Sequence, residues 1–274
     1  MEIERGFVRI AEGQMHYRRS VGDTDGRTLV MIHMSPVASG FLVPLMEEIG
    51  DARPLFAPDT LGNGDSAPAG EDDPDISYFA GALNRALDAI GIETIDLYGV
   101  RTGAMIATEF AIAYPGRVNR LFIDELPLAG SGTRTGTSGE PCPPPDSQGS
   151  QLDWAFHVMK DHWMFYPWWS RDAAHRMPWD LRTADVLHDQ TVEVLKAIRT
   201  FQSSYGAALR WPCDERISLI RVPTTVFYQP ERAMYADMKP TAQAISGADI
   251  AELPPGDLSP AAKAAVLRDW LARV

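Results

Sequence analysis

Apolar positions along the chain follow two alternating patterns. Short apolar runs predict strands at 28–33, 53–57, 94–98 and 118–124, and helical spacing predicts helices at 41–49, 77–90 and 102–114. In the clearest helix, Phe79, Leu83, Leu87 and Ile90 lie on one face, and Gly91 provides the stop signal. Strands that alternate with helices in this way predict an α/β fold, with a mostly parallel sheet and helices on both faces.

The alternation is interrupted after residue 124. Residues 130–150 are rich in Gly, Ser, Thr and Pro and predict a loop, whereas 151–210 read as helical. Six of the seven tryptophans lie between Trp154 and Trp211. The flanking parts of the chain predict strands at 7–10, 15–19, 224–228 and 250–253, and helices at 240–245 and 260–272. A helical insertion between strands is typical of a lid over a site at the carboxyl ends of the strands. We therefore expect a core of residues 1–126 and 213–274, with a lid at 127–212.

Composition narrows the classes of partner. The chain of 274 residues is 45% hydrophobic and carries a net charge of −12, which argues against nucleic acid and anionic membranes as partners. Cys142 and Cys213 fit no metal-ligand spacing and indicate reduced thiols, and the first ten residues lack a signal-peptide pattern. No dinucleotide-binding loop or metal-ligand cluster is recognisable, so we expect a cytoplasmic protein without cofactor or metal that binds a small molecule. The oligomeric state is left open, although an exposed aromatic lid could pack on a second copy.

The segment from Ile95 to Ala104 reads as a strand, a sharp turn and a helix. Its turn has the Gly-x-nucleophile-x-Gly spacing of a nucleophile elbow, in which Ser, Asp or Cys usually holds the central position. Here the central residue is Arg101. A guanidinium remains protonated, so it neither attacks a carbonyl carbon nor accepts a proton.

Three segments show that the chain resembles the α/β-hydrolase superfamily, in the branch of epoxide hydrolases, haloalkane dehalogenases and carbon–carbon bond hydrolases. His33-Met34-Ser35-Pro36 is similar to the His-Gly-x-Pro loop of that branch, and residues 57–66 match its Pro-Asp-x-x-Gly-x-Gly-x-Ser turn. Residues 99–103 and 113–118 match the elbow and the start of the following strand. The resemblance covers 1–127 and, more weakly, 218–274, and it implies an α/β-hydrolase fold.

The resemblance also assigns roles to particular positions. It implies an oxyanion hole formed by the backbone N–H groups of Ser35 and Thr102, with Met34 in place of the usual glycine. It implies a bracing role for His33.

The catalytic positions of the family are altered. The position of the catalytic histidine is taken by Asp257, and the acid position falls near Glu231 or Asp237. An alternative acid position, at the end of the neighbouring strand, is occupied by Asp124 and Glu125. A Ser-His-acid relay therefore cannot be assembled from the usual positions.

Arg101 requires an anionic partner if it is buried, and the family geometry makes Asp257 the nearest candidate. In one interpretation, Arg101 binds a substrate carboxylate or a developing oxyanion. In the other, an Arg101–Asp257 salt bridge fills an inactive site.

The lid supplies further candidates. His162 is a better candidate than His157 for a general base that reaches the site from the lid, although lid histidines are more often packing residues. Trp163 and Trp168 suggest an aromatic wall near the site, or alternatively the core of the lid itself.

These residues predict an enzyme that forms no serine ester. Arg101 would bind a carboxylate or polarise a carbonyl, assisted by the Ser35 and Thr102 amides, and Asp257 or His162 would transfer the proton. Water addition, elimination, decarboxylation or carbon–carbon cleavage of a small, aromatic carboxylate would fit. The alternative is a non-catalytic descendant that binds a ligand or a partner protein. A serine esterase with a displaced nucleophile is a third, weaker interpretation.

Overall fold

The computed structural model describes residues 1–22, 25–126, 128, 142–177, 180–230, 238–255 and 257–272. Its centre is an eight-stranded sheet with the order β1-β2-β4-β3-β5-β6-β7-β8. The strands are β1 (Glu2–Ile10), β2 (Gly13–Val21), β3 (Thr28–Ile32), β4 (Leu55–Pro58), β5 (Ile95–Val100), β6 (Val118–Asp124), β7 (Thr224–Tyr228) and β8 (Asp249–Glu252). The first two strands form an antiparallel hairpin that joins β4 at the edge, and strands β3 to β8 run parallel. The predicted α/β class is confirmed.

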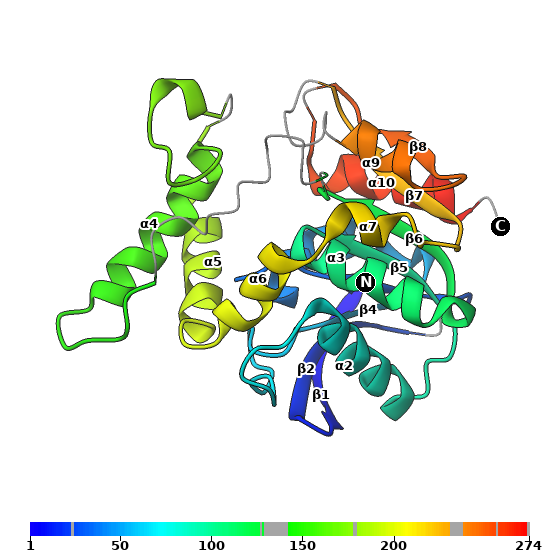
Figure 1. The fold of residues 1–274 in the computed structure, drawn as a ribbon, viewed down its shortest axis with the longest axis horizontal. Helices are drawn as coiled ribbons and strands as arrows, with labels where there is room; N and C mark the ends of the chain where they lie inside the picture. The colour runs from blue at the N-terminus through cyan, green and yellow to red at the C-terminus, as the bar shows by residue number, and fades with distance from the viewer. Residues whose placement is uncertain are drawn as a thin grey trace.

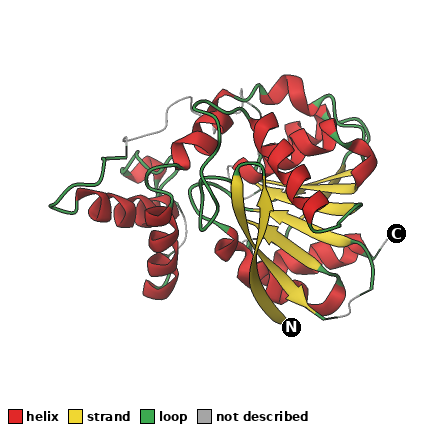
Figure 2. Ribbon diagram, turned by 90° about the horizontal axis from the view of Figure 1, so that it is seen from below, coloured by secondary structure: helices red, strands yellow, loops and turns green. Residues whose placement is uncertain are grey.

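Helices cover both faces of the sheet (Figure 2). In the core they are α1 (Val43–Ile49), α2 (Ile76–Ala89), α3 (Thr102–Ala113), α7 (Cys213–Ile217), α9 (Met238–Ala244) and α10 (Pro260–Leu271), with short 3-10 turns at Ser39–Leu42, Gly50–Ala52 and Pro115–Arg117. Alternate residues of the central strands enter different apolar clusters. Leu97 packs in the cluster of α2 and α3, whereas Tyr98 packs in that of α1 and α10. The period of two in a strand is the reason for this two-sided core.

The predicted core elements are present, with shifted ends. Strand β1 begins at Glu2, earlier than the expected residue 7, because it pairs along its whole length with β2. Helix α2 begins at Ile76, where the Asp75 side chain accepts a hydrogen bond from the Tyr78 amide and caps the helix. Hydrophobic spacing locates the apolar face of an element, whereas capping contacts and strand pairing fix its ends.

The segment between β6 and β7 is helical, with α4 (Ser150–Met164), a 3-10 turn at Ala173–His175, α5 (Ala184–Lys196) and α6 (Phe201–Arg210). Helices α4 and α5 stand to one side of the sheet, and α6 leads back towards α3 and α7 (Figure 1). Ala207, Ala208 and Trp211 belong to the apolar cluster of α2 and α3. Helix α6 is thus fixed to the core by its C-terminal half.

Tryptophan rings form much of the interior of this helical segment. The Trp154 ring stacks on Phe201 at a centroid distance of 5.9 Å and meets Trp168 edge-on at 6.4 Å. Trp168 is buried and also contacts Trp169. Within the described residues, no helix is long and apolar enough to cross a membrane.

Candidate active site

The turn between β5 and α3 has the geometry of a nucleophile elbow. Arg101 adopts φ 53° and ψ −114°, a backbone conformation that residues other than glycine rarely adopt. The flanking glycines are sterically required, because a Cβ at Gly99 would lie 2.4 Å from the Gly103 carbonyl oxygen and one at Gly103 would lie 2.2 Å from that of Ile32. The elbow is therefore retained, with an arginine at its apex.

Two side chains among the described residues contact the Arg101 guanidinium. Its Nε donates a hydrogen bond to the Glu125 carboxylate, which directly follows β6. One terminal nitrogen lies 2.6 Å from Nε2 of His162, on α4. The side chains of Arg101 and Glu125 are 26% and 13% exposed, so solvent still reaches part of this ion pair. Three distant segments thus meet at the elbow.

The contact with Arg101 determines the protonation of His162. Because a guanidinium only donates hydrogen bonds, Nε2 must accept, and the ring is neutral with its proton on Nδ1. Burial and the positive charge of Arg101 lower the pKa of His162 to about 3, against the opposing influence of Glu125. His162 is consequently uncharged at neutral pH.

The expected Arg101–Asp257 ion pair is wrong. Asp257 is exposed, and its carboxylate accepts a hydrogen bond from the Ser259 amide at 2.8 Å, just before α10. Hydrogen bonds from Ser259 lower the pKa of Asp257. Its carboxylate is satisfied by its own segment, while Glu125 reaches the guanidinium from the neighbouring strand end.

Asp124 lies inside the core. Its fully buried carboxylate accepts hydrogen bonds from the Tyr98 hydroxyl at 2.5 Å and from Lys263 Nζ at 2.6 Å. Burial and the Asp124 charge raise the pKa of Tyr98 well above its usual value. The Asp124 backbone carbonyl supports the elbow by accepting from the Arg101 amide at 3.0 Å. These contacts are those of a structural residue.

The loop after β3 is braced by His33. The Nδ1 atom of His33 lies 2.8 Å from the Met34 carbonyl oxygen, and Nε2 accepts a hydrogen bond from the Thr60 amide at 2.9 Å. This pattern requires a neutral ring, and burial lowers the pKa of His33. The Met34 side chain is buried in the cluster of α1. His33 thus links two loops, in the manner that the resemblance implies.

Two backbone donors border the elbow. Among the described residues, the amides of Ser35 and Thr102 have no hydrogen-bond acceptor. The N-terminus of α3 lies against the end of β3. A Cβ on Gly103 would come within 2.6 Å of the His33 carbonyl oxygen, which shows how closely the two segments approach. Amides at a helix start favour negative charge, so this arrangement is suited to an anionic oxygen.

The Ser35 side chain connects this loop to α6. Its hydroxyl lies 2.8 Å from that of Ser204, which also accepts a hydrogen bond from Asn63 at 3.1 Å. Neither Ser204 nor Asn63 stood out in the sequence, because no motif spacing relates residues 35, 63 and 204. Glu125 was identifiable only as an alternative acid position after a strand.

The two lid tryptophans occupy different places. The Trp163 ring meets that of His162 edge-on at 6.2 Å, its Nε1 donates to Gln190, and Arg182 lies over its face at 4.1 Å. Trp168 packs with other tryptophans within the helical segment. Glu231 and Asp237 lie outside the described residues.

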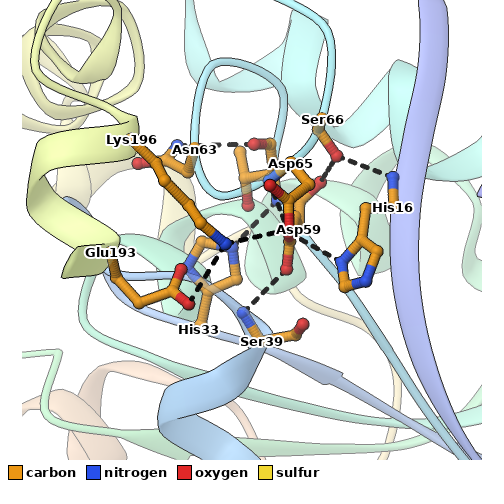
Figure 3. A network of polar contacts seen from close by, with 10 residues as sticks. His16, His33, Ser39, Asp59, Asn63, Asp65, Ser66, Glu193 and Lys196 are labelled. Atoms are coloured by element: carbon orange, nitrogen blue, oxygen red, sulfur yellow. Dashed lines mark hydrogen bonds and ion pairs between the residues drawn. The ribbon is translucent and has the colours of Figure 1, made fainter. Parts of the chain in front are cut away.

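One cluster of the described residues offers metal-ligand atoms, namely His16, Asp59 and Asp65 (Figure 3). Its oxygens are already engaged, because Asp59 accepts from His16 at 2.8 Å and from the Ser39 amide at 2.8 Å. Lys196 Nζ lies 2.9 Å from the Asp65 carboxylate and brings a positive charge to the same place. The cluster is a network that connects β2, the glycine-rich turn and α5.

The strand order, the elbow and the helical insertion before β7 define the α/β-hydrolase fold. No family model matches the chain. A solved hydrolase from Pseudomonas aeruginosa superposes with a TM-score of 0.69 at 16% identity, over 97% of this chain and 98% of that one. The chain therefore has the α/β-hydrolase fold, as the resemblance implies.

Curated relatives match in sequence over a shorter range. A 2-hydroxy-6-oxononadienedioate/2-hydroxy-6-oxononatrienedioate hydrolase of Paraburkholderia xenovorans is 34% identical over 138 residues, 46% of this chain and 44% of that protein. A cis-3-alkyl-4-alkyloxetan-2-one decarboxylase of Shewanella oneidensis is 30% identical over 131 residues, 45% and 39% of the two chains. The matched stretches thus span less than half of either relative.

Proposed function

We propose that this protein is an α/β-hydrolase-fold enzyme that binds a small carboxylate or carbonyl compound, with an aromatic carboxylate as the first candidate. It would act without a covalent intermediate at the elbow. The observation that carries the proposal is the contact of Arg101 with a neutral His162 at the start of α3, where the Thr102 amide has no acceptor among the described residues. The Ser35 amide, which also has no acceptor among these residues, would be the second backbone donor. A cation, two backbone donors and an uncharged imidazole are the groups needed to bind and polarise an oxygen.

The contact between Arg101 and His162 suggests how a substrate would engage the site. A carboxylate forms a stronger, charge-assisted hydrogen bond with a guanidinium than a neutral imidazole does, so it would displace Nε2 of His162. Its negative charge would also offset the Arg101 charge that helps to lower the pKa of His162. Substrate binding would then release His162 as a proton acceptor, while Glu125 keeps the guanidinium in place.

The relatives support this class of reaction. The Paraburkholderia relative is named as a hydrolase of an oxo-dicarboxylate, and the Shewanella relative is named as a decarboxylase. We extend to this chain only the shared class of reaction, cleavage next to a carbonyl or carboxyl carbon.

We further propose residues 127–212 as the lid, with a small molecule as partner. The net charge of −12 argues against nucleic acid or membranes, and Cys142 and Cys213, which are not joined in a disulfide, fit the cytoplasm.

A second function is favoured by one observation. Arg101 already contacts Glu125 and His162, as it would in an inactive site closed by polar contacts. The protein would then bind a ligand or a partner without chemistry.

The deciding experiment combines binding with turnover. Wild type and Arg101→Met would be titrated calorimetrically with benzoate, phenylacetate and pyruvate, and product formation from a panel of aromatic oxo acids would be followed by mass spectrometry. Arg85→Met is the matched control, because Arg85 also pairs with a glutamate, Glu12, far from the elbow. We expect wild type and the control to bind and convert ligand, and Arg101→Met to lose both. Binding without turnover would favour the second function, and ligand binding unaffected by Arg101→Met would contradict the first.

A further inference from the structure

Lys263 provides a counter-charge for a carboxylate inside the core. The Asp124 side chain is fully buried, and Lys263 Nζ lies 2.6 Å from its Oδ2. The lysine side chain is 14% exposed and belongs to the first turn of α10. A cation is unfavourable at the positive end of a helix, so α10 by itself does not explain a lysine at this position. The contact with Asp124 does.

The residue that follows Asp124 has a strained backbone. Glu125 adopts φ 54°, and among the described residues it shares a positive φ with one other non-glycine residue, Arg101. These two residues contact each other, since Arg101 Nε donates a hydrogen bond to the Glu125 carboxylate. Strain of this kind persists where the surrounding structure holds it, and it is frequent at functional sites. The direction in which the Glu125 side chain leaves β6 therefore depends on what holds its neighbours.

Both neighbours of Glu125 are held by helices of the core. On one side, the Asp124 carboxylate is bound by Lys263 of α10. On the other side, the buried Leu126 accepts a hydrogen bond on its carbonyl oxygen from the Thr241 hydroxyl of α9 at 2.8 Å. The bend at Glu125 is thus fixed from α10 before it and from α9 after it.

A chain of contacts continues from Glu125 to α4. The Glu125 carboxylate accepts from the Arg101 guanidinium, and a terminal guanidinium nitrogen lies 2.6 Å from Nε2 of His162. Because Nε2 accepts in this contact, the proton of the neutral ring is on Nδ1. The tautomer of His162 therefore reports where the guanidinium lies.

We propose that Lys263 is a positioning residue of the elbow: it holds Asp124 and thereby the bend that directs Glu125 to the Arg101 guanidinium. The inference goes beyond the proposed function, since it concerns the place of the guanidinium in a catalytic and in a binding site alike. Its consequence for ligand affinity rests on the proposed function, whereas its consequence for His162 does not.

The test is nitrogen NMR of the His162 ring in the full chain at pH 7. We expect wild type to show the form protonated on Nδ1, and Lys263→Met to show a mixture of the two neutral forms, because the guanidinium leaves Nε2. Arg268→Met is the matched control on the same helix. It removes a hydrogen bond to the Glu48 carbonyl oxygen at 2.6 Å and should leave the tautomer unchanged.

A double variant keeps the test independent of stability. Lys263→Met strands the buried charge of Asp124, whereas Asp124→Leu/Lys263→Met removes both charges and leaves an apolar pair that a core tolerates. We expect the double variant to show the same mixture of tautomers as Lys263→Met. In calorimetric titrations it should bind benzoate about tenfold more weakly than wild type, the loss expected for a displaced charge-assisted hydrogen bond.

The outcomes separate this inference from the proposed function. If the folded double variant keeps His162 protonated on Nδ1, or if Arg268→Met changes the tautomer equally, the positioning role of Lys263 is contradicted. If wild type itself lacks the Nδ1 form, the inference fails as well. If the tautomer changes as expected while wild type binds none of benzoate, phenylacetate and pyruvate, the proposed function is contradicted and the role of Lys263 stands.

Discussion

Arg101 combines a strained backbone with a charged side chain. A non-glycine residue at positive φ costs on the order of 1–3 kcal/mol, and the surrounding strands and helix must supply that free energy. The side chain then draws Glu125 and His162 towards the elbow. Glu125 follows β6 and His162 lies on α4, so the charge of one residue links the core with the helical insertion.

The ion pair predicts a coupling between Arg101 and Glu125. We expect Arg101→Met and Glu125→Gln each to lower the free energy of unfolding by about 1–3 kcal/mol, because each removes one partner of a partly buried pair. The double variant should be less destabilised than the sum of the two, with a coupling of about 1 kcal/mol. Urea unfolding of the four proteins measures this cycle, and strictly additive losses would contradict the pairing.

The contacts of His162 predict a dependence of stability on pH. The unfolded chain takes up the proton of this histidine near pH 6.5 and the folded protein only near pH 3, so the unfolded state binds more protons between these values. Wild type should therefore lose stability as the pH falls from 6.5 towards 3.

A variant isolates the His162 contribution from that of the other titrating groups. We expect His162→Gln to lose less stability than wild type between pH 7.5 and pH 5 in urea unfolding. His157→Gln is the control on the same helix, because its side chain is 44% exposed and faces Asp153. Identical pH dependence in His162→Gln and wild type would show that the ring is not held neutral.

At the scale of elements, polar contacts attach the insertion to the core. The Thr200 hydroxyl donates to the Gly62 carbonyl oxygen at 2.6 Å, and Ser204 joins Ser35 with Asn63. These contacts lie on the same side as the apolar contacts of Ala207 with the core. Helix α6 is consequently held by both kinds of contact.

Two adjacent serines on α6 provide a matched pair of variants. Ser204→Ala removes the partner of Ser35 and Asn63 and should cost about 1–3 kcal/mol of unfolding free energy. Among the residues that the structure describes, the Ser203 hydroxyl is buried without a partner, so Ser203→Ala should be neutral or slightly stabilising. Equal losses in the two variants, measured by urea unfolding, would argue against the contacts that we describe for Ser204.

For the whole molecule, the network around Asp59 joins parts of the chain that are far apart in sequence (Figure 3). Asp59 accepts from His16 of β2, from the Ser39 amide and from the Asp65 amide, and Asp65 in turn contacts Lys196 of α5. Burial by itself would raise the pKa of Asp59, but the hydrogen bonds from His16 and Ser39 hold it well below its usual value.

This network predicts a large effect of one isosteric change. Asp59→Asn places an amide nitrogen where a carboxylate oxygen accepts hydrogen bonds, and we expect it to cost about 3 kcal/mol at pH 7. Since the pKa of Asp59 is lowered by folding, the difference from wild type should shrink as the pH falls below 4. Asp73→Asn is the control, because the Asp73 side chain is 80% exposed and its pair with Arg210 should contribute less than about 1 kcal/mol. Similar losses in both variants would contradict the role of burial.

The sequence by itself determined the sheet, the helices on both faces and the elbow. These features follow from periodic apolar positions such as Phe79 and Leu83, and from Gly99 and Gly103, whose spacing is a local property of the chain. The arginine at the apex was equally visible, and with it the absence of an ordinary nucleophile. Patterns of this kind can be recognised from the sequence alone because each involves residues close together in the chain.

Only the tertiary structure decided which residues surround Arg101. A charged side chain pairs with the acid whose backbone position and rotamer bring it within reach, and sequence spacing does not encode that distance. Asp257 was therefore the wrong partner, whereas Glu125 and His162 lie against the guanidinium. The same reason applies to Ser35 and Ser204, which are 169 residues apart and in contact. Their meeting depends on how α6 packs on α3, a consequence of the buried apolar surface of the whole fold.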